Sequence, residues 1–179
     1  MVSNEEISVN KRNGRGKESL QIDKIHAMVG FATDGITGVS ASHVEMNSGI
    51  QLFDGISTAD IQQILIKSAN DLITLESPNY QYVAARLLLF SLRKQLFHRL
   101  WDHPKLIDHI KKLIDMGLYD KDILVNYDES EIDRMNMWID HERDYNFTYA
   151  GLRQVMDKYL VQDRSTGEIF ETPQFMYMM

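Results

Sequence analysis

Apolar and polar residues alternate near the start of the chain. Ile7 and Val9 precede Asn13-Gly14, while Leu20 and Ile22 follow it. Asn-Gly tolerates the positive φ angles of a tight turn, and period-two alternation places one face of each strand against a core. The pattern therefore predicts a β-hairpin of two short strands with one buried face.

Helical spacing of apolar residues then dominates the first hundred positions. Asp23 is a suitable N-cap for a helix over 24–32, and Ser42-x-x-Glu45 has the form of a capping box that would open a short helix. Ser57 to Asp60 opens a stronger stripe that should end near Glu76, before Pro78. From Tyr80 to Leu100 both helix faces are apolar, which is typical of a helix covered on several sides.

The second half carries weaker helical patterns. We expect helices over 106–116, 130–139 and 149–159, a hairpin turning at Ser165-Thr166-Gly167, and a final helix opened by Pro173. His103-Pro104 interrupts the pattern and marks residues 101–105 as a boundary. The sequence thus predicts a mainly α fold with small β-hairpins, divided into domains 1–103 and 104–179.

Basic residues concentrate in the predicted hairpin, at Lys11, Arg12, Arg15, Lys17 and Lys24. This segment is either a solvated hairpin tip or an anion-binding one, and charge alone favours the former. Lys94 lies two heptads after Tyr80, in line with an apolar stripe. Its ammonium either extends to solvent or meets an anion, because a buried lysine charge without a partner is costly.

Composition limits the function classes. The 179 residues are 44% hydrophobic and 25% charged, as in ordinary globular proteins, and the formal net charge of −7 argues against general nucleic-acid binding. No apolar stretch approaches the ~20 residues of a membrane span. The chain has no cysteine, which fits the cytoplasm and excludes disulfides and thiol chemistry by this chain alone.

No catalytic or metal-binding motif is complete. His141-Glu142-Arg143-Asp144-Tyr145 lacks the second histidine of a zinc-protease helix, so we interpret it as a charged segment that forms ion pairs. His98 and His103 have half of a zinc-site spacing, and no cysteine pair completes it. Gly14 to Lys17 is too short for a phosphate-binding Walker loop. We therefore expect no catalytic residues and no metal ligands.

Several segments, in one register, resemble a known family. Val9-x-Lys11-Arg12-Asn13-Gly14, Ile22-Asp23-Lys24-Ile25, residues 54–61 and residues 80–87 resemble an ATP-cone. The chain is more closely similar to the N-terminal part of the large (alpha) subunit of class I ribonucleotide reductase. Residues 141–144, 147–149, 158–161 and 166–174 continue that resemblance toward the segment before the catalytic barrel.

The resemblance implies an allosteric nucleotide site. In this family the ATP-cone switches overall activity, with ATP as activator and dATP as inhibitor, and magnesium is expected to accompany the nucleotide. The implied binding residues are Lys11, Glu18, Ser19, Leu20, Gln21, Ile22, Asp23, Lys24, Thr58 and Lys94. Close relatives can carry Asn at the position of Gln21 and His at that of Gln62, both near the nucleotide, and are one residue shorter between Gly14 and Asp23.

The resemblance also implies partners. The family's thioredoxin- or glutaredoxin-dependent reaction reduces ribonucleotides through a thiyl radical and a cysteine pair, none of which this chain contains. It would act with the remainder of the large subunit, which carries the catalytic barrel, and with the radical-generating small (beta) subunit, in an oligomer. Two alternatives remain open at this point: a free-standing nucleotide sensor, and a fragment that serves only as an assembly surface.

Overall fold

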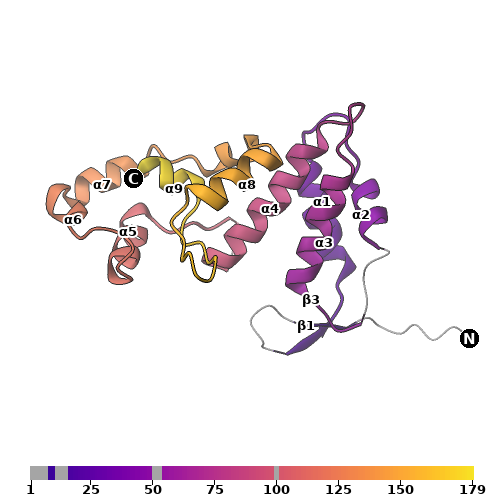
Figure 1. Cartoon of the computed structure of the whole chain (residues 1–179), viewed down its shortest axis with the longest axis horizontal. Coiled ribbons are helices and arrows are strands. Elements are labelled where there is room, and N and C mark those ends of the chain that lie inside the picture. Colours follow the sequence, from indigo (N-terminus) through magenta and orange to yellow (C-terminus); the bar gives the residue numbers. More distant parts are fainter. Residues whose placement is uncertain (1–7, 11–15, 50–53, 99–100) are drawn as a thin grey trace, which may run out of the picture. The chain divides into compact units, whose positions relative to one another are not determined.

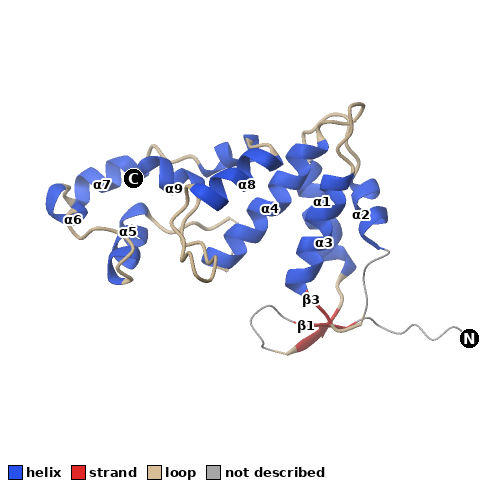
Figure 2. Ribbon diagram, viewed as in Figure 1, coloured by secondary structure: helices blue, strands red, loops and turns tan. Residues whose placement is uncertain are grey.

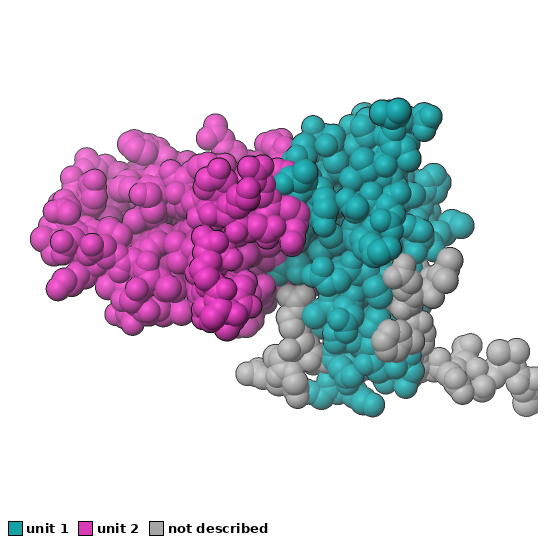
Figure 3. Space-filling view, viewed as in Figure 1, with its two compact units in different colours: residues 1–91, 148–150 teal, residues 92–147, 151–179 magenta. Residues whose placement is uncertain are grey.

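The computed structural model describes residues 8–10, 16–49, 54–98 and 101–179. Helices dominate it, with one small β-sheet (Figure 2). Two compact units can be distinguished: unit 1 comprises residues 1–91 with 148–150, and unit 2 comprises residues 92–147 with 151–179 (Figure 3). In the part of the chain just defined, no helix combines the length and apolar character needed to cross a membrane. The number and length of the helices confirm the predicted mainly α fold.

The sheet of unit 1 has the strand order β2-β1-β3, with β1 (Ser8–Asn10) in the centre. Strand β2 (Lys17–Ser19) is antiparallel to β1, and β3 (Ile56–Ser57) is parallel to it, so that Val9 lies beside both Glu18 and Ile56. Val9 and Ile56 are buried. The β-pairing is as predicted, whereas the Asn13-Gly14 turn lies outside the described residues.

The second strand begins and ends earlier than the alternation predicted. Leu20 follows β2, and Ile22 is the first residue of α1 (Ile22–Thr33), with 56% of its surface exposed. The prediction of a strand through Leu20 and Ile22 was therefore wrong. The helical spacing of Ile25, Met28, Val29 and Ala32 outweighs a two-residue alternation, because Val29 and Ala32 are buried by that helix.

Three further helices follow: α2 (Ala41–Gly49), α3 (Thr58–Asp71) and α4 (Tyr80–Phe97) (Figure 1). Helices α2 and α3 belong to unit 1, whereas the residues of α4 from 92 onward belong to unit 2. Two predicted boundaries were wrong. Ser42 lies inside α2 rather than at its N-cap, and α3 ends at Asp71 rather than near Glu76. The chain after α3 turns instead, with the N–H of Ser77 donating to both the carbonyl and the hydroxyl of Thr74.

Buried residues occur on several faces of α4, as its sequence predicted. Val83, Ala84, Leu87, Leu89 and Phe90 are at most 1% exposed. In unit 1, the Phe31 ring of α1 lies 5.4 Å from the Phe90 ring. Burying one such leucine or phenylalanine contributes roughly 1.5–3 kcal/mol relative to exposure.

Unit 2 is built from short helices. They are α5 (Leu106–Asp115), α6 (Ile123–Asn126), α7 (Glu129–Asn136), the 3-10 helix η1 (His141–Asn146), α8 (Tyr149–Lys158), whose first two residues count with unit 1, and α9 (Pro173–Met178). Its core contains Leu106, Ile107, Ile110, Ile132 and Phe175. Neither α6 nor η1 was predicted, because four and six residues are too few to show an apolar period.

Several local predictions in unit 2 are confirmed. Gly117 follows α5 with a φ of 70°, which favours glycine because it has no Cβ. The predicted hairpin forms around Gly167, where φ is 74°, with a bridge between Gln162 and Ile169. Pro173 is the first residue of α9, where a missing N–H costs nothing.

Candidate nucleotide-binding surface

The small sheet of unit 1 leads directly into two helices (Figure 1). Strand β2 is followed after two residues by α1, and β3 continues without a gap into α3. The first turn of any helix has N–H groups without helical partners and carries the positive end of the helix dipole. Unit 1 thus places two helix N-termini beside one three-stranded sheet, an arrangement suited to an anion.

Ser57 and Thr58 form the junction between β3 and α3. Ser57 is the N-cap: its hydroxyl accepts a 3.0 Å hydrogen bond from the N–H of Asp60 and donates one of 2.6 Å to the Asp60 carboxylate. Thr58 is the first helical residue and is partly buried. The predicted helix start at Ser57 to Asp60 is confirmed, and the capping by Ser57 fixes the position of Thr58 at the helix start.

Contacts between β1 and the turn before β3 hold this surface together. The backbone N–H and the hydroxyl of Ser8 donate to Asp54 Oδ1 at 2.8 and 2.7 Å, and Asn10 Nδ2 donates to the Gly55 carbonyl at 2.6 Å. These hydrogen bonds from Ser8, with the nearby charge of Lys17, lower the pKa of Asp54 below its ordinary value. Gly55 has a φ of 78°, the left-handed region in which glycine is unstrained.

The sequence pattern did not predict this parallel pairing. It indicated a turn at Asp54-Gly55, but the partner strand lies some 46 residues earlier. Only the short apolar pair of Val9 and Ile56 could have suggested the contact, and two residues are too few to define a register.

Residues 18–24 form a mostly exposed strip from β2 into α1. Glu18 and Leu20 are partly buried, and the remaining members, Ser19, Gln21, Ile22, Asp23 and Lys24, are exposed. Gln21, not the predicted Asp23, is the N-cap of α1, and its side chain makes no capping hydrogen bond. The strip combines carboxylate, amide, hydroxyl and ammonium groups with an exposed isoleucine, which is chemistry that can contact a sugar, a base and phosphates.

The other implied site residues have different positions. Lys11 lies outside the described residues. Lys94 is partly buried in the last turn of α4 and belongs to unit 2, so its assignment to the site rests on the resemblance. Gln62, one of the positions where relatives differ, is 2% exposed and donates a 2.8 Å hydrogen bond to the Leu87 carbonyl. Its side chain therefore connects α3 to α4.

The histidine-rich segments are not arranged as a metal site. Across 8–10, 16–49, 54–98 and 101–179, no group of three or more His, Asp or Glu side chains is placed to hold a metal ion. The segment His141-Glu142-Arg143-Asp144 forms most of η1, and Asp144 lies 3.6 Å from the guanidinium of Arg93. The interpretation of this segment as an ion-pairing one is confirmed for Asp144.

Comparison with known proteins defines the class first. Residues 7–95 match the ATP cone domain, and this range includes all three strands, the strip 18–24, and helices α1 to α3. The chain therefore contains an ATP-cone domain. The relatives then specify which ATP-cone protein it resembles. Over 176 residues it is 46% identical to the alpha subunit of ribonucleoside-diphosphate reductase 1 from Escherichia coli and 47% identical to the alpha subunit from Haemophilus influenzae.

The similarity extends well beyond the ATP cone. Both alignments cover 98% of this chain, and the alpha subunit of phage T4 is 42% identical over 96% of it. The chain is thus identified as a relative of the ribonucleoside-diphosphate reductase alpha subunit. It spans 23% of the length of the two bacterial relatives.

Proposed function

We propose that this chain is an allosteric part of a ribonucleotide reductase large subunit, which binds ATP as activator and dATP as inhibitor. Two observations support this proposal. Residues 7–95 match the ATP cone domain, and the remaining residues align with the same alpha subunits. A free-standing nucleotide sensor would share only the first of these matches, so the second favours the reductase.

The proposed site uses Lys11, Lys94, Thr58 and the strip 18–24. Lys11 and Lys94 would neutralise phosphate charge, with magnesium, and the N-terminus of α3 at Thr58 would add its unpaired N–H groups. Leu20 and Ile22 would pack against the base, while Glu18 would accept hydrogen bonds from base or sugar. This division of roles uses the exposed face that the β2-to-α1 junction creates.

The proposed mechanism is regulatory rather than chemical. These 179 residues contain no cysteine, so the proposed reduction of ribonucleotides requires thiols supplied from outside them. We propose that the remainder of the large subunit supplies these thiols and acts with the small subunit in the cytoplasm. ATP and dATP can shift the assembly only if each binds one assembly state more tightly than the other. The division at residues 103 and 104 is proposed to separate the regulatory domain from the segment that leads to the catalytic barrel.

Calorimetric titration with variants tests the nucleotide site. Lys11→Ala and Lys94→Ala should each weaken ATP and dATP binding about tenfold or more, because each removes a charge-assisted contact. Lys67→Ala is the matched control: Lys67 lies on α3, is exposed and pairs with Asp71. The control should bind as tightly as the parent chain. Absence of binding by the parent chain at millimolar nucleotide would contradict the proposal.

A further inference from the structure

Phe175 of α9 is enclosed by aromatic rings of unit 2. Its side chain is 0% exposed, and the His109 ring stacks on it at 4.2 Å with an interplanar angle of 19°. The rings of His141 and Phe97 meet it edge-on, at 5.0 and 6.3 Å. His103 in turn stacks on His141 at 3.8 Å and 10°. We call His103, His109 and His141 the imidazole cluster; Phe175 of α9 packs against it.

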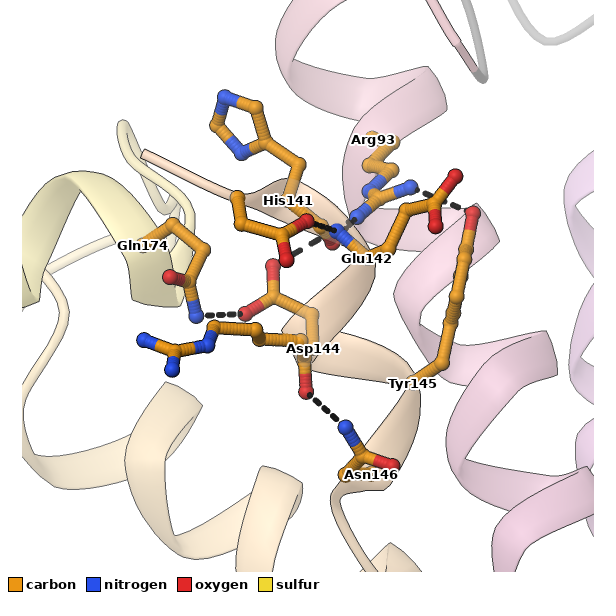
Figure 4. Close-up of polar contacts among 9 residues, drawn as sticks. Arg93, His141, Glu142, Asp144, Tyr145, Asn146 and Gln174 are labelled. Carbon is orange, nitrogen blue, oxygen red and sulfur yellow. Dashed lines mark hydrogen bonds and ion pairs between the residues drawn. The ribbon is translucent and has the colours of Figure 1, made fainter. Parts of the chain in front are cut away.

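A polar contact fixes α9 beside this cluster (Figure 4). Gln174 Nε2 donates a 2.8 Å hydrogen bond to Asp144 Oδ1, and Asp144 Oδ2 lies 3.6 Å from the Arg93 guanidinium. Arg93 also donates to the Tyr145 hydroxyl at 2.8 Å and to the His141 carbonyl at 2.5 Å. The guanidinium thus contacts three residues of η1: His141, Asp144 and Tyr145. The ring of His141 is a member of the imidazole cluster.

The surroundings of the imidazole cluster favour the neutral form of each ring. One ring nitrogen of each member, Nε2 of His103, Nε2 of His109 and Nδ1 of His141, is buried without a hydrogen-bond partner among the described atoms. Burial, aided by the charge of Arg93, lowers the pKa of His103 to about 4. Burial and the charge of Lys112 lower the pKa of His109 to about 4. Burial is the largest cause that lowers the pKa of His141 to about 3, and electrostatic interactions with His103, Arg93 and His109 lower it further.

The charged groups around the cluster come from every element packed against it. They are Arg93 of α4, Asp102 and Lys105 beside His103, Asp108 and Lys112 of α5, Asp140 and Asp144 of η1, and Glu171 before α9, to which the Tyr119 hydroxyl donates. Two of the acids have partners of their own: Asp144 contacts Arg93 and Gln174, and Glu171 accepts hydrogen bonds from Tyr119 and from the N–H of Val161.

We propose that α9 is a proton-sensitive latch, seated on unit 2 while the imidazole cluster is neutral and released when the cluster takes up protons. Two stacked rings with centroids 3.8 Å apart cannot both carry charge without strong repulsion. A charged ring would also face the buried guanidinium of Arg93. Release of Phe175 exposes the rings to water, where an imidazole protonates near its ordinary pKa of about 6.5.

Two neighbouring carboxyls act in the opposite direction. Burial raises the pKa of Asp144 to about 6, although Gln174 and Arg93 lower it. Burial also raises the pKa of Glu171, although the hydrogen bonds from Tyr119 and the N–H of Val161 lower it. The seated state therefore loses stability at three imidazoles as pH falls below 6.5, and regains part of it at these two carboxyls. Since three groups oppose two, the net effect of acid is release.

Hydrogen exchange of residues 173–179 in the whole chain, corrected for intrinsic rates, tests the latch. Each imidazole that becomes hydrated on release should raise the released fraction about tenfold between pH 7.5 and pH 5.5. We therefore expect exchange in α9 to accelerate at least tenfold over this range, while the buried segment 83–90 of α4 stays protected. His109→Phe keeps an aromatic ring on Phe175 without a titratable nitrogen and should remove about tenfold of the acceleration.

Controls separate the latch from general acid unfolding. His26→Gln alters a histidine of unit 1 that pairs with Glu45, and the variant should keep the full acceleration. His103→Gln, a smaller change, provides a second titration-deficient variant if His109→Phe does not fold. Unchanged exchange in α9 down to pH 5.5, or full acceleration in both cluster variants, would overturn the proposal.

Discussion

Arg93 is a charged residue whose side chain is buried in unit 2. Its side chain is 2% exposed, although an arginine always carries a charge. The charge is compensated by Asp144, by hydrogen bonds to Tyr145 and His141, and by the Tyr145 ring 5.0 Å from the guanidinium carbon. Such a pair contributes little net stability, but removing one partner leaves a buried charge uncompensated.

Arg93→Met should therefore lower the free energy of unfolding by about 3–5 kcal/mol at pH 7. The loss should be smaller at pH 5.5, because Asp144 without Arg93 takes up a proton more readily. Urea unfolding followed by circular dichroism measures both values. Arg153→Met is the control: Arg153 pairs with Asp157 on the surface of α8, and its loss should cost about 0.5 kcal/mol. Equal losses for the two variants would contradict this assessment of Arg93.

The sequence could predict some residues of the candidate site and not others. Thr58 was expected at a helix start because residues 57–60 precede an apolar stripe with helical spacing, which is a local signal. The hydrogen bond from Gln62 to Leu87 could not be predicted, since nothing local distinguishes it from the exposed Gln63. Arg93 and Asp144 likewise lie 51 positions apart in the chain, and only tertiary packing brings them together.

At the scale of elements, helices with several turns were predicted well. Helices α1, α3, α4 and α5 have ten or more residues, with apolar residues that recur over at least two turns, so their period is detectable. Strand β3, helix α6 and η1 have six residues or fewer and depend on contacts elsewhere in their own unit. The predicted start of α2 was wrong because Ser42 has the sequence of a capping motif but lies inside the helix instead of at its N-cap.

Two serine variants test the corrected boundaries. Ser57→Ala removes the hydroxyl that accepts the hydrogen bond from the N–H of Asp60, and should lower the free energy of unfolding by about 1 kcal/mol. Ser42→Ala should change it by less than about 0.5 kcal/mol, because Ser42 is exposed inside α2. Thermal unfolding of both variants measures the difference. A cost at Ser42 equal to that at Ser57 would restore the original prediction of the N-cap.

At the scale of the whole molecule, the chain contains an ATP-cone domain and a second unit with its own core. The ATP-cone match ends at residue 95, within α4, and the similarity to reductase alpha subunits continues through unit 2. These residues have a net charge of −7 and no cysteine, so the proposed function is nucleotide sensing for thiol chemistry that takes place outside them.

The most direct test of the account is an ATP titration of the isotopically labelled chain followed by amide chemical shifts. We predict saturable shifts over residues 18–24 and at the first turn of α3, around Thr58, with dATP affecting the same amides. Residues 106–115 of α5 serve as the internal reference and should move least. No saturable shift at millimolar ATP, or shifts that avoid both 18–24 and Thr58, would contradict the proposed nucleotide site.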